Sequence, residues 1–403
     1  MGVVSLHDIN QAQKRLQGFV HRTELTYSRT FSEIAGNEIY LKNENLQKTG
    51  SFKIRGALNK MATLSDQEKQ RGVIASSAGN HAQGVALGAT LYGISATVVM
   101  PAGAPLAKVA ATRGYGAEVA LYGTAYDDAY AKARQLQAET GAVFLHPFDD
   151  PEVIAGQGTI GVEILEDLPA LDAVVVPVGG GGLISGLAVA LKEMKPSVKV
   201  IGVEAAGAPC MLASMQAGRI TTLNSVATIA DGIAVKQPGE LTFGLISKYV
   251  DEIVTVEDEE IANAILMLLE RAKVVAEGAG AAPVAAILQH KLSFTGKKVA
   301  AVVSGANIDV NILARVLDRG LIKAGRKVQF RMIIPDRPGQ LQQVLAAIAE
   351  TQSNVVGINH DRSKKKVAVG YAEVEFVLET LDKAHADALL SMLAAKGYEV
   401  EVL

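Results

Sequence analysis

The segment Gly50-Ser51-Phe52-Lys53-Ile54-Arg55-Gly56-Ala57 places one lysine among small and apolar residues at the predicted start of a helix. The positive end of a helix dipole disfavours a cation, so a lysine at this position requires an explanation. Apolar surroundings and a positive helix end both lower the pKa of an amine and favour its neutral form. The neutral amine is the form that attacks a carbonyl carbon in Schiff-base chemistry. We therefore take Lys53 as the candidate reactive group of the chain.

The composition indicates a large globular protein with more than one domain. The chain has 403 residues, of which 49% are hydrophobic, and its net charge is -3 with no basic block that would suggest nucleic-acid binding. Cys210 is the single cysteine, which excludes an internal disulfide and favours a reducing compartment. The N-terminus has no signal-peptide pattern, and no apolar run reaches the roughly 18 residues of a membrane span. We therefore expect a cytoplasmic enzyme with no membrane partner.

Short apolar strands alternate with helices through the first three quarters of the chain. Strands are predicted at residues 38–41, 72–77, 96–100, 118–121, 143–145, 173–178, 199–203, 252–256 and 298–303. Helices are predicted at 5–17, 27–35, 54–61, 106–113, 125–140, 153–167, 209–216 and 258–272, and residues 218–250 are predicted as loop with a short helix. This alternation is typical of parallel sheets with helices on their faces.

The pattern changes near residues 321–326. The remaining residues predict strand 328–334, helix 340–351, strands 354–359 and 368–378, helix 381–395 and strand 398–403. This is the βαββαβ order of a ferredoxin-like fold. The segment resembles an ACT domain, a small module with which many amino-acid enzymes bind effector amino acids.

Three turns after predicted strands carry residues suited to a ligand. Backbone N–H groups of the turn Ser77-Ala78-Gly79-Asn80-His81 suit a carboxylate, although such a loop is as often a helix cap. Four glycines at 179–182 let the backbone approach an anion closely, and neither a Walker lysine nor a spaced G-x-G-x-x-G pattern accompanies them. Ser304 follows a strand at the end where open α/β sheets bind ligands, and a helix N-cap is the equal alternative.

The lysine segment and these three turns closely resemble, in this order, the fold-type II pyridoxal-phosphate enzymes, the group of threonine and serine dehydratases and serine racemases. The resemblance extends over about residues 5–320. It implies an α/β fold like that of the tryptophan synthase β chain, with two open parallel sheets. It further implies a catalytic domain at 1–320, with a smaller subdomain at about 65–147, and an ACT regulatory domain at 326–403.

The resemblance also implies a role for each candidate residue. Lys53 would be the catalytic residue and would carry pyridoxal 5'-phosphate as a Schiff base. The other cofactor contacts would be Asn80 at the ring hydroxyl, Gly179, Gly180, Gly181, Gly182 and Leu183 at the phosphate, and Ser304 at the pyridine nitrogen. The substrate carboxylate would be held by Ser77, Gly79, Asn80 and His81, with residues 227–235 on the substrate side. Glu277 matches a glutamate near the family's site, but a capping role for it is equally plausible.

The Ser-Ala-Gly-Asn-His turn resembles that of threonine dehydratases. It implies β-elimination that converts L-threonine to 2-oxobutanoate and ammonia, and L-serine to pyruvate. In serine racemases a serine supplies the acid or base on the opposite face of the substrate, and here that position is Ala78. A serine racemase/serine dehydratase, a β-replacement enzyme and a non-catalytic amino-acid sensor remain alternatives.

The resemblance extends to regulation, assembly and metal binding. Gly339, in the strand-to-helix loop of the ACT segment, is the candidate effector contact, with Asn354 a second one. The effector would be a pathway amino acid, isoleucine or valine first, in isoleucine biosynthesis. Because ACT modules pair side by side, a homo-oligomer, either a dimer or a tetramer, is expected. Some racemase relatives bind a divalent cation through a Glu and an Asp. Here Glu204 is present but Cys210 stands at the Asp position, so no divalent metal site is predicted.

Overall fold

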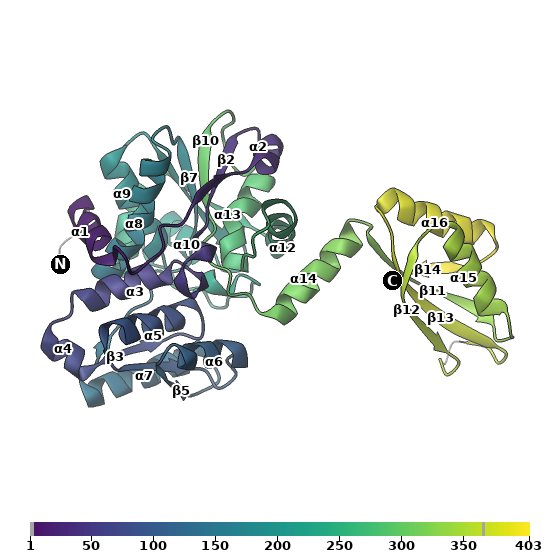
Figure 1. The fold of residues 1–403 in the computed structure, drawn as a ribbon, viewed down its shortest axis with the longest axis horizontal. Coiled ribbons are helices and arrows are strands. Elements are labelled where there is room, and N and C mark those ends of the chain that lie inside the picture. Colours follow the sequence, from purple (N-terminus) through teal and green to yellow (C-terminus); the bar gives the residue numbers. More distant parts are fainter. Residues whose placement is uncertain (1–3, 365–366) are drawn as a thin grey trace. The chain divides into compact units, whose positions relative to one another are not determined.

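The computed structural model describes residues 4–364 and 367–403. The chain divides into two compact units between Asp309 and Val310, each with its own sheet or sheets and its own core (Figure 1). The division puts helix α14 (Val310–Lys323) in the second unit, whereas the sequence analysis placed most of that helix in the first domain. Among the helices of the described ranges, none is long and apolar enough to cross a membrane.

The first unit contains a six-stranded sheet. Its strand order is β1 (Leu25–Tyr27), β2 (Glu38–Lys42), β10 (Lys298–Val302), β7 (Ala173–Pro177), β8 (Lys199–Ala205) and β9 (Glu252–Val256). The last five strands run parallel, and β1 pairs antiparallel with β2 at the edge. The predicted parallel α/β architecture is confirmed. The predicted helix 27–35 is too long, because Ser28 caps α2 (Arg29–Ala35) and the residues before it form β1.

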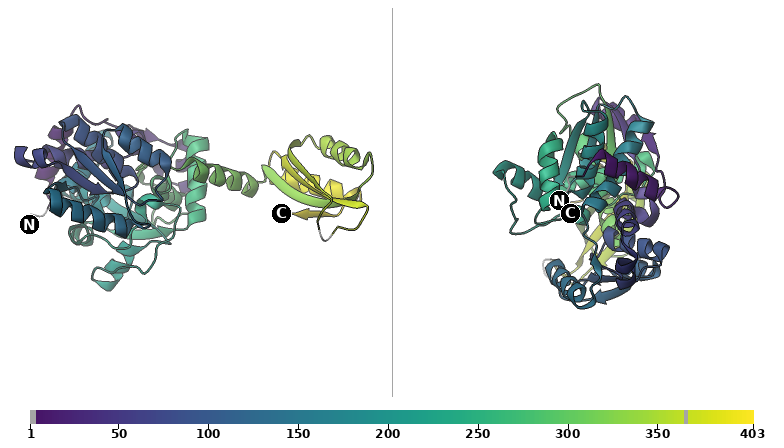
Figure 2. Two further views of the ribbon diagram at one scale, coloured as in Figure 1. Left: turned by 90° about the horizontal axis from the view of Figure 1, so that it is seen from below. Right: turned by 90° about the vertical axis from the view of Figure 1, so that its left-hand side faces the viewer.

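Helices cover both faces of this sheet (Figures 1 and 2). One face packs against α8 (Pro151–Asp167), α9 (Gly182–Met194) and α11 (Glu240–Tyr249). The other face holds α13 (Gly278–Leu288), all of whose residues are buried. A helix that is buried on all sides shows no amphipathic period, which is why the sequence analysis missed α13. The remaining helical elements around this sheet are α1 (Leu6–Leu16), η1 (Glu44–Leu46), η2 (Lys48–Gly50), α10 (Cys210–Ala217), η3 (Asp231–Ile233), α12 (Asp258–Met267) and η4 (Leu268–Ala272).

A second, fully parallel sheet lies within residues 73–144. Its order is β5 (Glu118–Leu121), β4 (Ala96–Met100), β3 (Val73–Ser76) and β6 (Val143–Phe144). One face packs against α3 (Lys53–Ala62), α5 (Asn80–Tyr92) and α6 (Leu106–Gly114), and the other against α7 (Tyr126–Thr140). Helix α4 (Asp66–Arg71) leads into β3. This sheet lies inside the range 65–147 that the sequence analysis proposed for a smaller subdomain.

Two glycines let α3 cross α8 at close range. A Cβ atom on Gly156 would lie 2.6 Å from the carbonyl oxygen of Arg55 and 2.7 Å from the Cα atom of Gly56. A Cβ atom on Gly56 would lie 2.8 Å from the carbonyl oxygen of Val153. The two backbones therefore touch directly, and this contact fixes the position of the helix that begins at Lys53.

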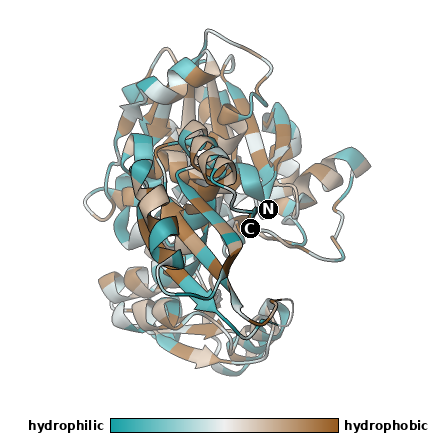
Figure 3. Ribbon diagram, turned by 90° about the vertical axis from the view of Figure 1, so that its right-hand side faces the viewer, coloured by the Kyte–Doolittle hydropathy of each residue, from teal (hydrophilic) through white to brown (hydrophobic). Residues whose placement is uncertain are grey.

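Besides α14, the described part of the second unit contains a four-stranded antiparallel sheet and two further helices. The order is β12 (Asn354–Asp361), β13 (Tyr371–Glu379), β11 (Lys327–Pro335) and β14 (Val400–Val402), and α15 (Gln340–Glu350) and α16 (Lys383–Ala395) cover one face. Hydrophobic and hydrophilic residues alternate along its strands (Figure 3). This is the predicted ferredoxin-like arrangement.

The close crossing of α3 and α8 generates a prediction about stability. Gly156→Ala should lower the free energy of unfolding by about 1–3 kcal/mol, because the new methyl group must push the two helices apart. Gly244→Ala is the matched control, since this glycine is exposed within α11 and a Cβ atom there meets nothing within 4 Å. It should raise the free energy of unfolding by about 0.5–1 kcal/mol through helix propensity. Denaturant titration measures both, and equal effects of the two substitutions would contradict the crossing.

Candidate active site

A cavity of about 820 Å³ lies at the carboxyl ends of strands from both sheets of the first unit. This volume is within the range of small-molecule sites, about 300–1,000 Å³. Every residue that the sequence analysis assigned to the catalytic, cofactor and carboxylate roles lines it: Lys53, Ser77, Gly79, Asn80, His81, Gly179, Gly180, Gly181, Gly182, Leu183 and Ser304. The fold thus brings together residues that are widely separated in the sequence.

Lys53 is the first residue of α3. Its Nζ atom donates a hydrogen bond to the carbonyl oxygen of Pro147 at 2.8 Å and lies 5.1 Å from the centre of the Phe52 ring. Burial lowers the pKa of Lys53 to about 8, and the negative charge of Glu277 acts in the opposite direction. At pH 7 about a tenth of such amines are neutral, compared with well under 0.1% of ordinary lysines.

The turn after β10 is joined to the lysine segment by its main chain. The N–H group of Phe52 donates to the carbonyl oxygen of Ser304 at 3.1 Å, and that of Ala306 donates to the carbonyl oxygen of Gly50 at 2.9 Å. Ser304 itself is buried at the carboxyl end of its strand. These bonds fix the serine and the lysine on the wall of one cavity, although about 250 residues separate them in the chain.

The glycine run follows β7 and leads directly into α9. A Cβ atom on Gly180 would lie 2.4 Å from the ring of Phe148, and one on Gly179 would lie 2.9 Å from the Cα atom of Ile233. Gly181 has a φ of 96°, which L side chains rarely adopt. Glycine is therefore required by the packing around the loop. The loop's position before α9 directs a helix N-terminus, which favours anions, towards the cavity.

The turn 77–81 connects β3 to α5. Within it the N–H group of Gly79 donates to the hydroxyl of Ser77 at 3.2 Å. His81 is buried, and its Nε2 atom lies 2.9 Å from the carbonyl oxygen of Leu145. Burial lowers the pKa of His81 to about 3, with the positive charge of Lys53 as a second cause. The imidazole is neutral at pH 7, so Nε2 carries the proton that it donates to Leu145, and the ring does not act as a proton donor to substrate.

Glu277 has a larger place in the site than the sequence analysis gave it. It lines the cavity in a buried position, and its Oε1 atom accepts a hydrogen bond from Asn80 Nδ2 at 2.6 Å. Burial raises the pKa of Glu277 to about 7, and the charge of Asp231 raises it further. This carboxyl group therefore changes its protonation state in the physiological range. In the sequence, the match to a family glutamate was the sign that Glu277 belongs to the site. Its burial in the structure is the evidence that favours this over a capping role.

Lys108 and Phe148 also line the cavity and were missed from the sequence. Lys108 Nζ forms an ion pair with Asp231 at 2.7 Å, which joins α6 to the segment predicted on the substrate side. In the sequence Lys108 is one of several polar residues on an amphipathic helix, and Phe148 lies in a loop. Neither has a local signal, because their role depends on which elements the fold brings beside them.

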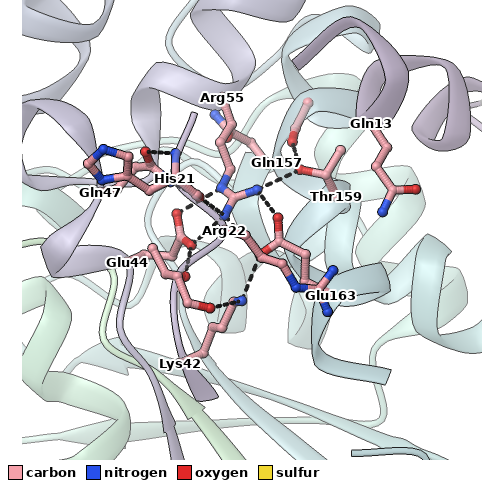
Figure 4. A network of polar contacts seen from close by, with 12 residues as sticks. Gln13, His21, Arg22, Lys42, Glu44, Gln47, Arg55, Gln157, Thr159 and Glu163 are labelled. Atoms are coloured by element: carbon pink, nitrogen blue, oxygen red, sulfur yellow. Dashed lines mark hydrogen bonds and ion pairs between the residues drawn. The ribbon is translucent and has the colours of Figure 1, made fainter. Parts of the chain in front are cut away.

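A buried network of charges surrounds Arg55, which lies on the same helix as Lys53 (Figure 4). Arg55 donates hydrogen bonds to Glu44 at 2.7 Å and to Glu163 at 2.6 Å. Lys42 donates to Glu163 at 2.6 Å, and all four side chains are buried. Burial alone would raise the pKa of Glu163, but the charges of Arg55 and Lys42 lower it below its usual value. Two cations and two carboxylates thus form a neutral group that joins α3 to α8 and to β2.

Glu204 and Cys210 are the residues that the sequence analysis compared with the divalent site of some racemase relatives. Both carboxylate oxygens of Glu204 accept backbone hydrogen bonds, from Met211 at 2.9 Å and from Leu212 at 2.8 Å. The Cys210 thiol lies 3.8 Å from the carbonyl oxygen of Gly179. In the described part of the chain, no group of three or more His, Cys, Asp or Glu residues is arranged to hold a metal ion. The lack of a divalent site stays a prediction.

The two candidate effector contacts of the second unit lie apart. Gly339 has a φ of 88° and directly precedes α15, whereas Asn354 follows the C-terminal end of that helix. The 11 residues of α15 span about 16 Å. Asn354 donates instead to Glu379 Oε2 at 3.0 Å. Within one chain, therefore, the structure does not bring Gly339 and Asn354 into a single site.

Two known protein families match most of the chain, one in each compact unit. Residues 16–305 match the family described as pyridoxal-phosphate dependent enzyme, and residues 328–395 match the ACT domain. The L-threonine ammonia-lyase of Thermotoga maritima is 58% identical over 401 residues, covering 100% of both chains. Among solved structures, threonine deaminase isoform 2 from Solanum lycopersicum superimposes with a TM-score of 0.74 at 39% identity, covering 78% of this chain and 86% of that one. Maize serine racemase gives a TM-score of 0.75 at 38% identity, covering 80% and 99%.

The raised pKa of Glu277 predicts a pH-dependent loss of stability in the cofactor-free protein. A carboxyl group whose folded pKa of about 7 exceeds its ordinary value of 4.5 stabilises the fold below pH 4.5, and this contribution is lost as the pH rises through 7. Glu277→Gln still accepts from Asn80 but cannot ionise. The thermal midpoint of Glu277→Gln minus that of the parent protein should therefore increase as the pH is raised from 5 to 8.

Glu33→Gln is the matched control, since Glu33 is an exposed glutamate on α2 and its substitution removes the same charge. Thermal unfolding of the three proteins at both pH values gives the comparison. If Glu277→Gln follows the same pH dependence as the parent protein, the raised pKa is wrong.

Proposed function

Because this chain belongs to the pyridoxal-phosphate-dependent enzymes and ends in an ACT domain, we propose that it deaminates L-threonine to 2-oxobutanoate and ammonia. The observation that carries the proposal is one cavity lined by a partly buried lysine of lowered pKa, a glycine loop at a helix N-terminus and a serine at a strand end. The full-length similarity to an L-threonine ammonia-lyase supports threonine as the substrate.

The cavity fits the cofactor that the family requires. Lys53 Nζ is placed to hold the aldehyde carbon, and the amides of the glycine loop suit the phosphate, because no side chain can occupy that loop. Ser304 would face the pyridine nitrogen and Asn80 the ring hydroxyl. Bound pyridoxal phosphate supplies an electron sink for the substrate α-carbon. A neutral hydroxyl at Ser304 does not force the ring nitrogen to be protonated, which favours prompt loss of a leaving group.

Lys53 also serves as the base of the reaction. With substrate in place of Lys53 at the cofactor, the Nζ atom would be a free amine, and its lowered pKa would leave it able to accept the α-proton near neutral pH. Loss of the α-proton and of the β-hydroxyl removes one water from L-threonine. The enamine that remains takes up water and releases 2-oxobutanoate and ammonia. L-serine has the same β-hydroxyl and would give pyruvate.

The turn 77–81 would hold the substrate carboxylate through backbone N–H groups at the start of α5. Serine racemase activity is the alternative function that similarity to maize serine racemase favours. Racemisation needs a proton donor on the opposite face of the substrate, and Ala78 lines the cavity without any titratable group. Elimination is therefore the proposed reaction.

Regulation by an amino acid is the proposed role of the ACT domain. Gly339 is the proposed contact, because its exposed backbone precedes a helix and carries no side chain. Asn354 would meet it only if a second copy of the domain paired alongside. We therefore propose a homo-oligomer with isoleucine or valine as the first effectors to test. The single cysteine fits a reducing compartment, so the proposed location is the cytoplasm.

The reaction is tested by Lys53→Ala in the full chain. The variant should lose turnover of L-threonine and L-serine together with the visible absorbance of lysine-bound cofactor, because it removes the amine that would hold the cofactor and accept the α-proton. Lys14→Ala on the exposed surface of α1 is the matched control and should keep both. Product analysis for 2-oxobutanoate and an absorbance scan provide the readouts. Turnover by Lys53→Ala at the parental rate would overturn the assignment.

The effector site is tested by Gly339→Asn, which adds a side chain that tolerates a positive φ. Calorimetry with isoleucine and valine should show binding to the parent protein that weakens at least about tenfold in the variant, a loss of about 1.4 kcal/mol. Gly397→Asn is the matched control, since Gly397 also has a φ of 88° and open space around its Cβ position. Equal affinity in both variants would exclude Gly339 from the site.

A further inference from the structure

Asn307 follows β10 three residues after Ser304, and neither the family resemblance nor the proposed mechanism uses it. Its Nδ2 atom donates two hydrogen bonds, to the carbonyl oxygen of Thr49 at 2.7 Å and to Asn80 Oδ1 at 2.7 Å. Asn80 Nδ2 then donates to Glu277 Oε1 at 2.6 Å. One chain of hydrogen bonds therefore runs from the backbone before Lys53, through Asn307 and Asn80, to the buried glutamate of the cavity.

The direction of every bond in this chain follows from its first member. A backbone carbonyl oxygen only accepts, so the Asn307 atom that faces Thr49 must be the N–H₂ group. The same N–H₂ group faces Asn80, so the Asn80 atom opposite must be the oxygen Oδ1. Asn80 Nδ2 consequently points to Glu277, whose Oε1 accepts whether or not its other oxygen carries a proton. The side-chain amide of Asn80 is thereby held in one of its two possible orientations.

We propose that Asn307 is a positioning residue that fixes the Asn80 amide with its N–H₂ group towards the bound cofactor, a role that rests on the proposed function. An amide N–H₂ group has two hydrogens, and Glu277 takes one of them. The second hydrogen is available to an acceptor in the cavity, such as the ring oxygen of the cofactor. With the amide reversed, Oδ1 would face both groups, and Asn80 would have no N–H to donate to the Glu277 carboxylate or to the ring oxygen.

Close packing holds Asn307 in place. A Cβ atom on Gly50 would lie 2.8 Å from Asn307 Oδ1, and one on Gly305 would lie 2.4 Å from Glu277 Oε1 and 3.1 Å from Asn80 Nδ2. The glycines on either side of the chain of hydrogen bonds thus leave room only for these polar groups. The lysine segment and the turn after β10 are in close contact here, which places the Asn307 amide between Thr49 and Asn80.

Thr49 gives a second reason for the bond from Asn307. This residue has a φ of 63°, a strained conformation that is rare for a β-branched side chain. The hydrogen bond to its carbonyl oxygen stabilises the turn that leads into Lys53. Asn307 therefore acts on both sides of the cofactor site, on the lysine segment and on Asn80.

The test compares Asn307→Asp and Asn307→Ala with Asn37→Asp in the full chain. A carboxylate at position 307 cannot donate to Thr49 or Asn80, and alanine removes the donor without adding charge. Asn37 is the matched control, because its buried Nδ2 atom donates to two carbonyl oxygens, of Ala35 at 3.2 Å and of Phe294 at 3.3 Å, and it does not line the cavity. Three quantities are measured: the dissociation constant of pyridoxal phosphate, the pH dependence of the visible absorbance of the loaded protein, and the thermal midpoint of the cofactor-free protein.

We expect both Asn307 variants to bind pyridoxal phosphate at least about tenfold more weakly, the 1.4 kcal/mol of one lost hydrogen bond. The pH at which the visible band changes should also shift. Asn37→Asp should lower the thermal midpoint without either effect. If the Asp variant does not fold, the Ala variant decides. The proposal is overturned if the Asn307 variants lose only thermal stability, as Asn37→Asp does. If the parent protein binds the cofactor but leaves L-threonine intact, the proposed function fails, and the cofactor measurements still judge Asn307.

Discussion

The buried pairing of Arg55 with Glu44 and Glu163 is the interaction on which the position of the candidate lysine, Lys53, depends. Arg55 lies two residues after Lys53 in the same helix, and its guanidinium is about 1% exposed. Because Lys42 completes the group, the two positive and two negative charges cancel, and each charge that has lost its water gains hydrogen bonds. Removing one partner from such a group leaves a buried charge uncompensated, which typically costs about 3–5 kcal/mol. Helix α3 can therefore dock in only one register.

The position of α3 places Lys53 on the cavity wall, where its pKa is lowered. The carboxyl ends of β3, β7 and β10 all open on the cavity, and each is followed by a turn that supplies backbone or hydroxyl groups. Lys53 faces these turns from the start of α3, with Pro147 as its hydrogen-bond partner. Burial in this position lowers its pKa, and burial of Glu277 raises the pKa of that carboxyl group in the same cavity. The pKa values of these two groups, which lie far apart in water, are thus both brought close to 7.

In the second unit, the order of the elements could be predicted from the sequence, but the relative positions of the candidate effector contacts could not. Its βαββαβ order could be predicted because alternating strands and amphipathic helices leave a clear period in the sequence. The distance between the two candidate contacts, Gly339 and Asn354, could not be predicted in the same way, since it depends on the length of α15, which lies between them. A family resemblance assigns residues to a domain, but the length and direction of the helix between them decide which of these residues lie in contact.

By itself the sequence determined the fold class, and its resemblance to a known family gave the cofactor. The lysine, serine and glycine turns could be picked out as candidates because each has a local signature next to a strand or helix boundary. It could not reveal α13, which is buried on all sides and has no amphipathic period. Nor could it assign Glu277, Lys108 or Asn307, whose partners lie far away in the chain. Only the tertiary structure brings these residues to their partners, because desolvation and the polarity of a hydrogen-bond chain depend on what surrounds a group in space.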